Sequence, residues 1–437
     1  METALTSRHR ATSRERWAWY LYDFGNSAYA AVVLLAVYSA YFKGTVVGGE
    51  RGTWLWGLAL GIAMLVVAVI SPILGAIADH SGTKKRFLFF FTSMACLATA
   101  LLFFVQKGDI WSGMLFFILA EIGYRSAQVF YDALLPEIAE ENEIGRVSGN
   151  GWAIGSAGGI VCLILVLALI MLIGGSLTVR LSLVITALFF ALAAAPLFAW
   201  LRERTVAQPL APGETYPGLA YRRIKQTFVE IKHYRELFKF LIAFLVYNDG
   251  ILMTMNFASI MGAVLYGLNQ QQLILFMILV QVTSVVGAYV FGLVVDRMGG
   301  KPSLMICLGL MVAAVLWMFF NQSTSVFFVI GGLAGFALTG VQSVSRSMIG
   351  MLAPVEKSAE FYGFFAVAGR TSSFIGPTIY GWLASRIARW YEVQGQTAEM
   401  AEKLGLRLAL FSIIAFLIVG AILLGFVKRS RRIASQN

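Results

Sequence analysis

The chain has 437 residues, of which 59% are hydrophobic and only 13% are charged, and its mean hydropathy is +0.76. Because no soluble domain hides that much apolar surface, the composition excludes a soluble globular protein and predicts an integral membrane protein. The formal net charge of +11 follows from membrane topology and from anionic headgroups on the cytoplasmic side, so we expect no nucleic-acid partner.

Apolar segments long enough to cross a bilayer follow one another along the whole chain. We predict an all-α integral membrane protein with twelve transmembrane helices, at residues 17–42, 54–78, 87–106, 110–135, 149–174, 179–200, 238–262, 271–295, 303–320, 325–352, 362–385 and 407–427. If both termini are cytoplasmic, most of the 34 Lys and Arg residues fall on the cytoplasmic side. The expected location is therefore the plasma (inner) membrane, with a polar leader at 1–16 that is not a signal peptide.

Polar side chains in the first predicted span share one helix face. Asp23, Asn26 and Ser27 are spaced so that they lie together on a helix. Amide and hydroxyl groups in such a place suit a zwitterionic or hydroxylated solute. The alternative is hydrogen bonding between membrane helices, which also uses these residue types.

A short polar turn follows the second predicted span. Its sequence, Gly75-Ala-Ile-Ala-Asp79-His80-Ser-Gly82-Thr-Lys84-Lys85, places an acidic residue and two basic residues at the predicted cytoplasmic surface. Such a turn can cap and pair with neighbouring helix ends, and so hold the cytoplasmic side closed until ligand or proton binding loosens the contact. The alternative is a solvated turn with ordinary topology-determining lysines. The sequence thus predicts a gating loop at Gly75, Asp79, Gly82, Lys84 and Lys85.

The fourth predicted span carries a charged stripe in an otherwise apolar segment. Glu121, Arg125, Gln128 and Asp132 recur at spacings of four, three and four, so they share one helix face. A charge exposed to hydrocarbon costs about 2.5–3.5 kcal/mol or more, and the stripe must therefore face a protein interior or an aqueous cavity. These four residues are candidates for substrate or proton binding. The alternative is a static ion pair between Glu121 and Arg125.

A linker at 201–237 separates the two predicted six-helix halves. Ile224, Phe228 and Ile231 lie on one face of a predicted amphipathic helix whose other faces are basic. Such a helix binds at the surface of a leaflet with anionic headgroups. A plain linker helix is a compatible alternative. A longer external loop, partly helical, is predicted at 386–406.

The second half contains further polar residues inside predicted spans. Asp249 and Asn256 lie on one face of the seventh helix, Arg346 lies in the tenth and Arg370 in the eleventh. Glu121, Arg125 and Asp249 fall near the middle of their spans, with Arg370 somewhat short of it. We expect these residues and the polar groups of the first half to converge on a central cavity that binds the solute or a proton.

Two internal matches show that the halves repeat each other. Gly292, Asp296, Arg297, Gly299 and Lys301 form a second copy of the gating loop, at an offset of 292 − 75 = 217. Pro136, Gly145 and Gly151 match Pro354, Gly363 and Gly369 at an offset of 218. The predicted domains are therefore the leader 1–16, a six-helix half at 17–200, the linker 201–237, a six-helix half at 238–427 and a basic tail at 428–437.

The two loops resemble the major facilitator superfamily over the whole chain, since the first copy matches the signature G-x-x-x-D-[RK]-x-G-x-[RK]-[RK] except that His80 replaces the usual base. Three shorter stretches are similar to the vacuole-effluxer branch of that superfamily and its bacterial relatives. They are Trp19-Tyr-Leu-Tyr-Asp23-Phe-Gly-Asn26-Ser27-Ala, Phe130-Tyr-Asp132-Ala-Leu-Leu-Pro136 and Tyr247-Asn248-Asp249-Gly. The resemblance implies the two-half major facilitator fold and transport, with amino acids as the first substrates to consider.

We expect a monomeric secondary transporter that moves a small polar metabolite by alternating access, coupled to protons. The sequence predicts no cofactor and no metal site, because Cys96, Cys162 and Cys307 are scattered and the three histidines lie outside the spans. A lipid or lysolipid flippase on the same scaffold is an alternative. An intramembrane lipid-modifying enzyme that uses Glu121 and Asp132 is less favoured, since eleven residues of helix separate them by roughly 16 Å.

Overall fold

The computed structural model describes residues 11–47, 49–140, 142–205, 207–208, 215–229, 234–268 and 270–428. These ranges are helical almost throughout and contain no strand. Most of the predicted leader, at 1–10, and of the predicted basic tail, at 429–437, lies outside them. The all-α fold predicted from the sequence is confirmed.

The chain forms two compact units, and one segment of the second predicted half belongs to the first unit. Unit 1 is Met1–Phe228 together with Ala353–Phe364, and unit 2 is Val229–Leu352 together with Phe365–Asn437. The short segment Ala353–Phe364 comes from the second half of the sequence and yet packs as part of unit 1. Hydropathy gives no sign of this, because it reports the length of a span and not its neighbours.

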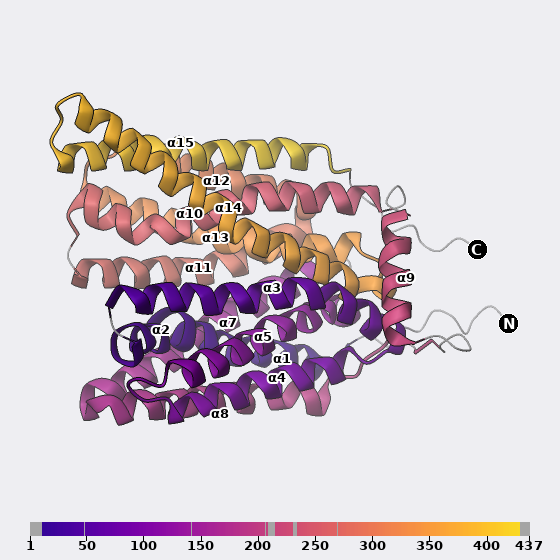
Figure 1. Ribbon diagram of the computed structural model, residues 1–437. Coiled ribbons are helices and arrows are strands. Elements are labelled where there is room, and N and C mark those ends of the chain that lie inside the picture. The colour runs from indigo at the N-terminus through magenta and orange to yellow at the C-terminus, as the bar shows by residue number, and fades with distance from the viewer. Residues whose placement is uncertain are drawn as a thin grey trace. The chain divides into compact units, whose positions relative to one another are not determined.

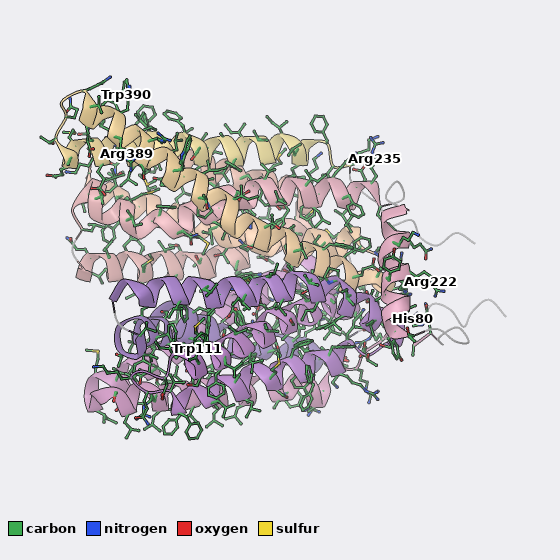
Figure 2. The ribbon with its side chains drawn as sticks, in the orientation of Figure 1. His80, Trp111, Arg222, Arg235, Arg389 and Trp390 are labelled. Carbon is green, nitrogen blue, oxygen red and sulfur yellow. The ribbon has the colours of Figure 1, made fainter. Side chains whose placement is uncertain are left out.

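In unit 1 the long helices lie side by side, and α9 crosses their ends (Figure 1). The elements are α1 (Ser13–Tyr29), η1 (Ala30–Ala36), α2 (Tyr38–Tyr41), η2 (Phe42–Val47), α3 (Gly49–Ser81), α4 (Lys84–Leu101), η3 (Leu102–Phe104), α5 (Ile110–Ala133), α6 (Leu135–Ile138), α7 (Ile144–Ile173), α8 (Gly175–Trp200) and α9 (Tyr216–Val229). The first span is longer than predicted and irregular, since η1 and η2 are π-helical. His80 and Trp111 mark opposite ends of unit 1, and Arg222 points away from the helix ends that α9 crosses (Figure 2).

Unit 2 contains α10 (Arg235–Tyr266), α11 (Gln270–Met298), α12 (Gly300–Phe320), α13 (Thr324–Leu352), most of α14 (Ser358–Val393) and α15 (Ala398–Gly425), while η4 (Val355–Lys357) belongs to unit 1. Within it, α11 packs along α13 and α10 along α15. The segment predicted as a partly helical external loop at 386–406 is helical over most of its length, because α14 continues to Val393 and α15 begins at Ala398. Both helices continue beyond their apolar segments.

Ten helical segments in the described ranges are long and apolar enough to cross a membrane. Two further long helices, α5 and α14, are more polar, and together with the ten they are consistent with the predicted twelve. The predicted amphipathic helix is present as α9, which ends at Val229, whereas Ile231 and the side chains of Ile224 and Phe228 lie outside the described part of the chain.

Close helix contacts in each unit depend on glycine. A Cβ atom at Gly158 of α7 would lie 2.1 Å from the carbonyl oxygen of Phe24 in α1, and a Cβ atom at Gly287 of α11 would lie 2.1 Å from that of Phe336 in α13. Small residues let membrane helices approach this closely, because lipid supplies little hydrophobic drive for helices to associate. These contacts hold the helices in register and so position the polar groups described next.

Candidate functional site

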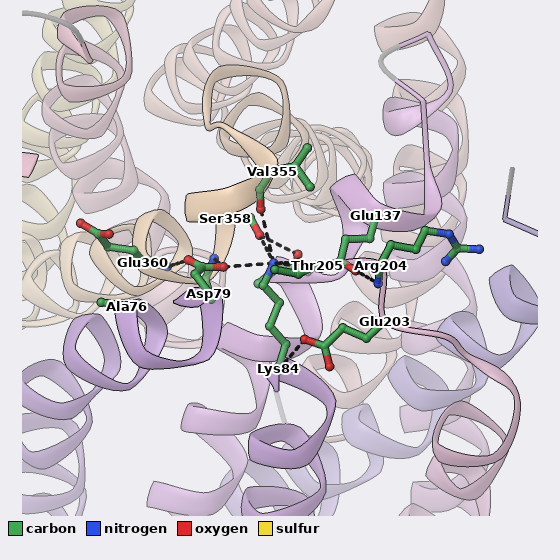
Figure 3. Close-up of polar contacts among 12 residues, drawn as sticks. Ala76, Asp79, Lys84, Glu137, Glu203, Arg204, Thr205, Val355, Ser358 and Glu360 are labelled. Carbon is green, nitrogen blue, oxygen red and sulfur yellow. Dashed lines mark hydrogen bonds and ion pairs between the residues drawn. The ribbon is translucent and has the colours of Figure 1, made fainter. Parts of the chain in front are cut away.

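Five chain segments of unit 1 meet around the side chain of Lys84 (Figure 3). They are the last turn of α3, the first residue of α4, the short helix α6, residues 201–205 after α8, and the start of α14. We call Asp79, Lys84, Glu137, Thr205 and Ser358 the Lys84 cluster. The side chains of Asp79, Lys84 and Glu137 are fully buried, so their charges must be satisfied inside the protein.

One ammonium group serves two carboxylates in the cluster. The Nζ atom of Lys84 lies 3.0 Å from Oδ1 of Asp79 and 2.8 Å from Oε1 of Glu137. It also donates to Oγ of Ser358 at 2.8 Å and to Oγ1 of Thr205 at 3.1 Å. Two negative charges against one positive charge leave the cluster with an excess of one negative charge, which a further positive group must balance.

The start of α14 supplies that positive group. The backbone N–H of Ala359 donates to Oδ1 of Asp79 at 3.1 Å, and the N–H of Glu360 donates to Oδ2 at 2.9 Å. The first N–H groups of a helix have no partner within the helix and carry the positive end of its dipole. Asp79 on α3 therefore caps α14 from outside, and Ser358 Oγ donates to the carbonyl of Ala133 at 3.0 Å.

Two glycines of the predicted gating loop make these contacts possible. A Cβ atom at Gly75 would lie 2.5 Å from the carbonyl oxygen of Ala359, so only glycine lets α3 and α14 touch here. Gly82 has φ +58°, a left-handed conformation that favours glycine, and forms the turn between α3 and α4. A Cβ atom at Gly82 would also lie 2.7 Å from the carbonyl oxygen of Thr205.

Residues after α8 complete the cluster, and no motif in the sequence indicates their role. Thr205 Oγ1 donates to Oε1 of Glu137 at 2.7 Å, and Arg204 N donates to Oε2 at the same distance. Glu203 accepts from the N–H of Lys84 at 2.7 Å and from that of Lys85 at 3.2 Å, and thereby caps α4.

The two carboxylates of these flanking segments have shifted pKa values. Burial by itself raises the pKa of Glu137, but the ion pair with Lys84 and the hydrogen bonds that Glu137 accepts outweigh this and hold its pKa below the ordinary value of 4.5. Burial raises the pKa of Glu203 above the ordinary value, although the N–H groups of Lys85 and Lys84 oppose the shift. Glu137 is thus ionised down to a lower pH than an ordinary glutamate.

The second predicted gating loop makes different contacts, within unit 2. Gly299 has φ +87° at the turn between α11 and α12, where Gly292 is buried, Asp296 half-buried and Arg297 exposed. The Nζ atom of Lys301 donates to the carbonyls of Gly425 at 2.6 Å and Val427 at 2.7 Å, at the C-terminal end of α15. Lys84 and Lys301 are equivalent in the repeat. Among the described residues, however, Lys84 contacts carboxylates, whereas Lys301 contacts backbone carbonyls.

The α5 stripe forms a second polar group in unit 1. Nε of Arg125 donates to Oε1 of Glu121 at 2.7 Å, and Glu121 is fully buried while Arg125 is 28% exposed. The Arg125 guanidinium lies 5.0 Å from the ring centre of Tyr124, whose hydroxyl accepts from Gln128 at 3.2 Å. Asp132 lies half-buried at the end of α5. The pair that sequence analysis offered as an alternative is therefore present, with the guanidinium partly accessible.

Asp23 and Asn26 of α1 are both buried, at 8% and 2% exposure. Asp23 lies against α7, where a Cβ atom at Gly155 would approach its Cγ to 2.9 Å. The Oδ1 atom of Asn26 has no hydrogen-bond partner among the described residues. A buried acceptor without a partner is uncommon in proteins and is suited to a water molecule or a ligand.

Unit 2 holds the remaining predicted site residues. Oδ1 of Asp249, which is 1% exposed, accepts from the N–H of Gly376 at 2.7 Å, immediately before Pro377 in α14. Arg346 is buried in α13, and Asn256 is exposed. The side chain of Arg370 lies outside the described part of the chain. Each unit therefore contains its own buried carboxylate near mid-span, and the common chamber that joins them stays a prediction.

Residues 56–437 match the family model described as "Vacuole effluxer Atg22 like". The chain belongs to this family. Over 430 residues it is 29% identical to the uncharacterized MFS-type transporter YxiO of Bacillus subtilis (strain 168), covering 96% of this chain and 95% of the relative. It is 22% identical over 428 residues to Autophagy-related protein 22 of Coccidioides immitis (strain RS), covering 78% and 69% respectively.

Solved structures show the fold of this Atg22-like chain. The human organic anion transporter MFSD10 superposes with a TM-score of 0.71 at 14% identity, covering 94% of this chain and all of that one. A bacterial homologue of the iron transporter ferroportin, in its outward-facing state, gives 0.69 at 13% identity over 94% of this chain and 98% of that chain. The predicted major facilitator resemblance is confirmed, and the chain is a multi-pass membrane transporter of that kind.

Proposed function

We propose that this chain is a secondary transporter that moves a small polar metabolite by alternating access, with the Lys84 cluster holding the start of α14 in one of the two states. The observation that carries the proposal is the cap that Asp79 places on α14, because it joins the charged turn after α3 to a helix that comes from the second half of the sequence.

The cluster is strong enough to define a state and small enough to release. Each hydrogen bond to a charged group contributes about 1.5–3 kcal/mol. The start of α14 is held through the two N–H groups that donate to Asp79 and through Ser358, while Glu137 and Thr205 keep Lys84 satisfied without it. Water that enters at the helix end can replace the few bonds that are lost.

The course of α14 supports a role for this contact in the transport cycle. The helix begins at Ser358 within unit 1, passes out of unit 1 after Phe364, and continues as part of unit 2. Any rearrangement of the two units must act on this one continuous helix. We therefore place the contact that breaks and re-forms at Gly75, Asp79 and Lys84.

The buried carboxylates Glu121 and Asp249 are the proposed proton carriers, and Arg125 is the proposed contact for an anionic group of the solute. Intramembrane charges are costly and commonly mark such pathways. Amino acids are the first substrates to test, through the family resemblance. The protein is further proposed to act as a monomer in the plasma membrane, with both termini cytoplasmic and no enzymatic activity.

Proteoliposomes test this proposal with a panel of amino acids, sugars, organic acids and lysolipids. We expect saturable exchange of one small polar class, and uptake that an imposed pH gradient accelerates. Glu121→Gln and Asp249→Asn should abolish the response to the gradient, because neither amide can carry the proton. Glu402→Gln, which removes an exposed carboxylate of α15, is the control and should keep it. Gradient-driven uptake that persists in both variants would refute carboxylate coupling, and transfer of lysolipids alone would refute a polar metabolite as substrate.

A further inference from the structure

Beside the Lys84 cluster, a groove opens on the surface of unit 1 where α3 ends and α4 begins. It has a volume of about 670 Å³ and is walled by the start of α4 and the chain after α8. Lys85 and Arg86 supply its basic groups, and Phe89 and Phe198 supply an apolar wall. The groove is separate from the intramembrane carboxylates, and nothing in the proposed transport cycle uses it.

The charges of the groove favour binding of an anion by its basic side chains. Arg86 is exposed, and its guanidinium group has no hydrogen-bond or ion-pair partner within the described ranges. Nζ of Lys85 donates to the carbonyl of Leu201 at 2.7 Å, which leaves it further hydrogens to donate. The one carboxylate in the groove, Glu203, has both oxygens engaged by the N–H groups of Lys84 and Lys85. The groove therefore has two basic side chains, and its one carboxylate already accepts hydrogen bonds from backbone N–H groups.

The surface that continues from the groove is apolar and exposed. On α4, Arg86 is followed on the same face by Phe89, Phe90 and Leu97, which are 57%, 59% and 64% exposed. The ring of Phe89 meets that of Phe198 edge to face, with centroids 5.2 Å apart, so the apolar wall is fixed in place. Along this membrane-spanning helix, basic groups at one end are followed by an exposed apolar surface. A phospholipid matches this arrangement, because it has a charged headgroup followed by apolar chains. A free anion and an acidic peptide lack the apolar chains.

The geometry points to a binding site for one anionic phospholipid, with its phosphate between Lys85 and Arg86 and an acyl chain along Phe89, Phe90 and Leu97. Each Lys or Arg side chain near an anionic leaflet contributes about 1 kcal/mol to such binding. The lipid also tightens the neighbouring cluster, since Glu203 connects the groove to the backbone of Lys84. A leaflet rich in anionic lipid therefore stabilises the protein through this site.

Thermal unfolding of the purified full-length protein in a neutral detergent tests the site. Added phosphatidylglycerol should raise the unfolding temperature in a saturable way, whereas phosphatidylcholine and inorganic phosphate at equal concentration should not. An equal effect of phosphatidylcholine would overturn the charge requirement. An equal effect of inorganic phosphate, or of an acidic peptide, would overturn the assignment to a lipid.

The double variant Lys85→Gln/Arg86→Gln should weaken phosphatidylglycerol binding about thirtyfold, or about 2 kcal/mol. Lys43→Gln/Lys107→Gln removes two charges at the opposite end of α3 and α4 and is the matched control, for which we expect no change in affinity. Native mass spectrometry that counts bound lipids provides a second readout, independent of stability. Equal weakening in the two double variants would show diffuse attraction and would overturn the proposal.

Discussion

Lys84 carries a full charge on a fully buried side chain, and its partners determine what the cluster can do. A buried ion pair seldom adds net stability compared with apolar residues, but removing one partner costs about 3–5 kcal/mol because the other charge is left uncompensated. The cluster therefore specifies one arrangement of α3, α4, α6 and the start of α14. Its value lies in the state it defines.

At the residue scale, Glu137 gives a pH dependence whose sign follows from its lowered pKa. Glu137 binds a proton more readily in the unfolded protein than in the folded protein. Its contribution to stability is therefore complete above the ordinary pKa of 4.5, and it is lost as the pH falls through the lower pKa of the folded state. Wild type should therefore be more stable than Glu137→Gln near neutral pH, and this difference should close in acid. Thermal unfolding of both proteins from about pH 7 to about pH 3.5 measures it. A difference that is constant over this range would contradict the account.

Among the elements, α3 and α14 show how a contact between distant segments depends on a missing side chain. The carbonyl group of Ala359 occupies the space that a Cβ atom at Gly75 would need. Pro72, four-fifths of a turn earlier on α3, similarly meets Gly363 of α14, where a Cβ atom would lie 3.0 Å from its Cα. The start of α14 therefore rests against α3 through backbone on both sides, and Asp79 adds the polar contact.

Gly75→Ala should displace the start of α14, because the atoms that its Cβ would meet are backbone and cannot rotate away. We expect a loss of about 1–3 kcal/mol in stability, typical of an overfilled contact. Gly61→Ala on the same helix is the control, since no atom lies within 4 Å of its Cβ position, and it should be neutral or stabilising by up to about 1 kcal/mol. Unfolding temperatures compare the two, and equal values would contradict the close contact.

For the whole molecule, hydropathy predicted the helices well because the thickness of the bilayer fixes the length of an apolar run. It missed helix ends such as that of α14 at Val393, since polar residues outside the bilayer can continue a helix. The spacing of Asp79 and Lys84 predicted a polar contact at helix ends. Glu137, Thr205 and Ser358 lie 53, 121 and 274 residues from Lys84, and no local pattern could bring them to it.

The repeat also set an expectation that the structure refines. Equivalent positions in two halves predict equivalent loops, and the turn glycines Gly82 and Gly299 do share a positive φ. Lys84 and Lys301 nevertheless hold different helix ends, the start of α14 and the end of α15. The sequence repeat therefore predicts the shape of each turn. The helix end that each lysine binds depends on which segments pack against the turn in its own unit.

The central claim is that the start of α14 is held by Asp79 and is released during transport. Hydrogen–deuterium exchange of the peptide spanning 353–364, read by mass spectrometry, measures this directly, since the N–H groups of Ala359 and Glu360 are buried and bonded to Asp79. We predict slow exchange in the resting wild type, and faster exchange both in Asp79→Asn and in wild type supplied with a transported solute. Exchange of this peptide that neither the substitution nor the solute alters would contradict the account.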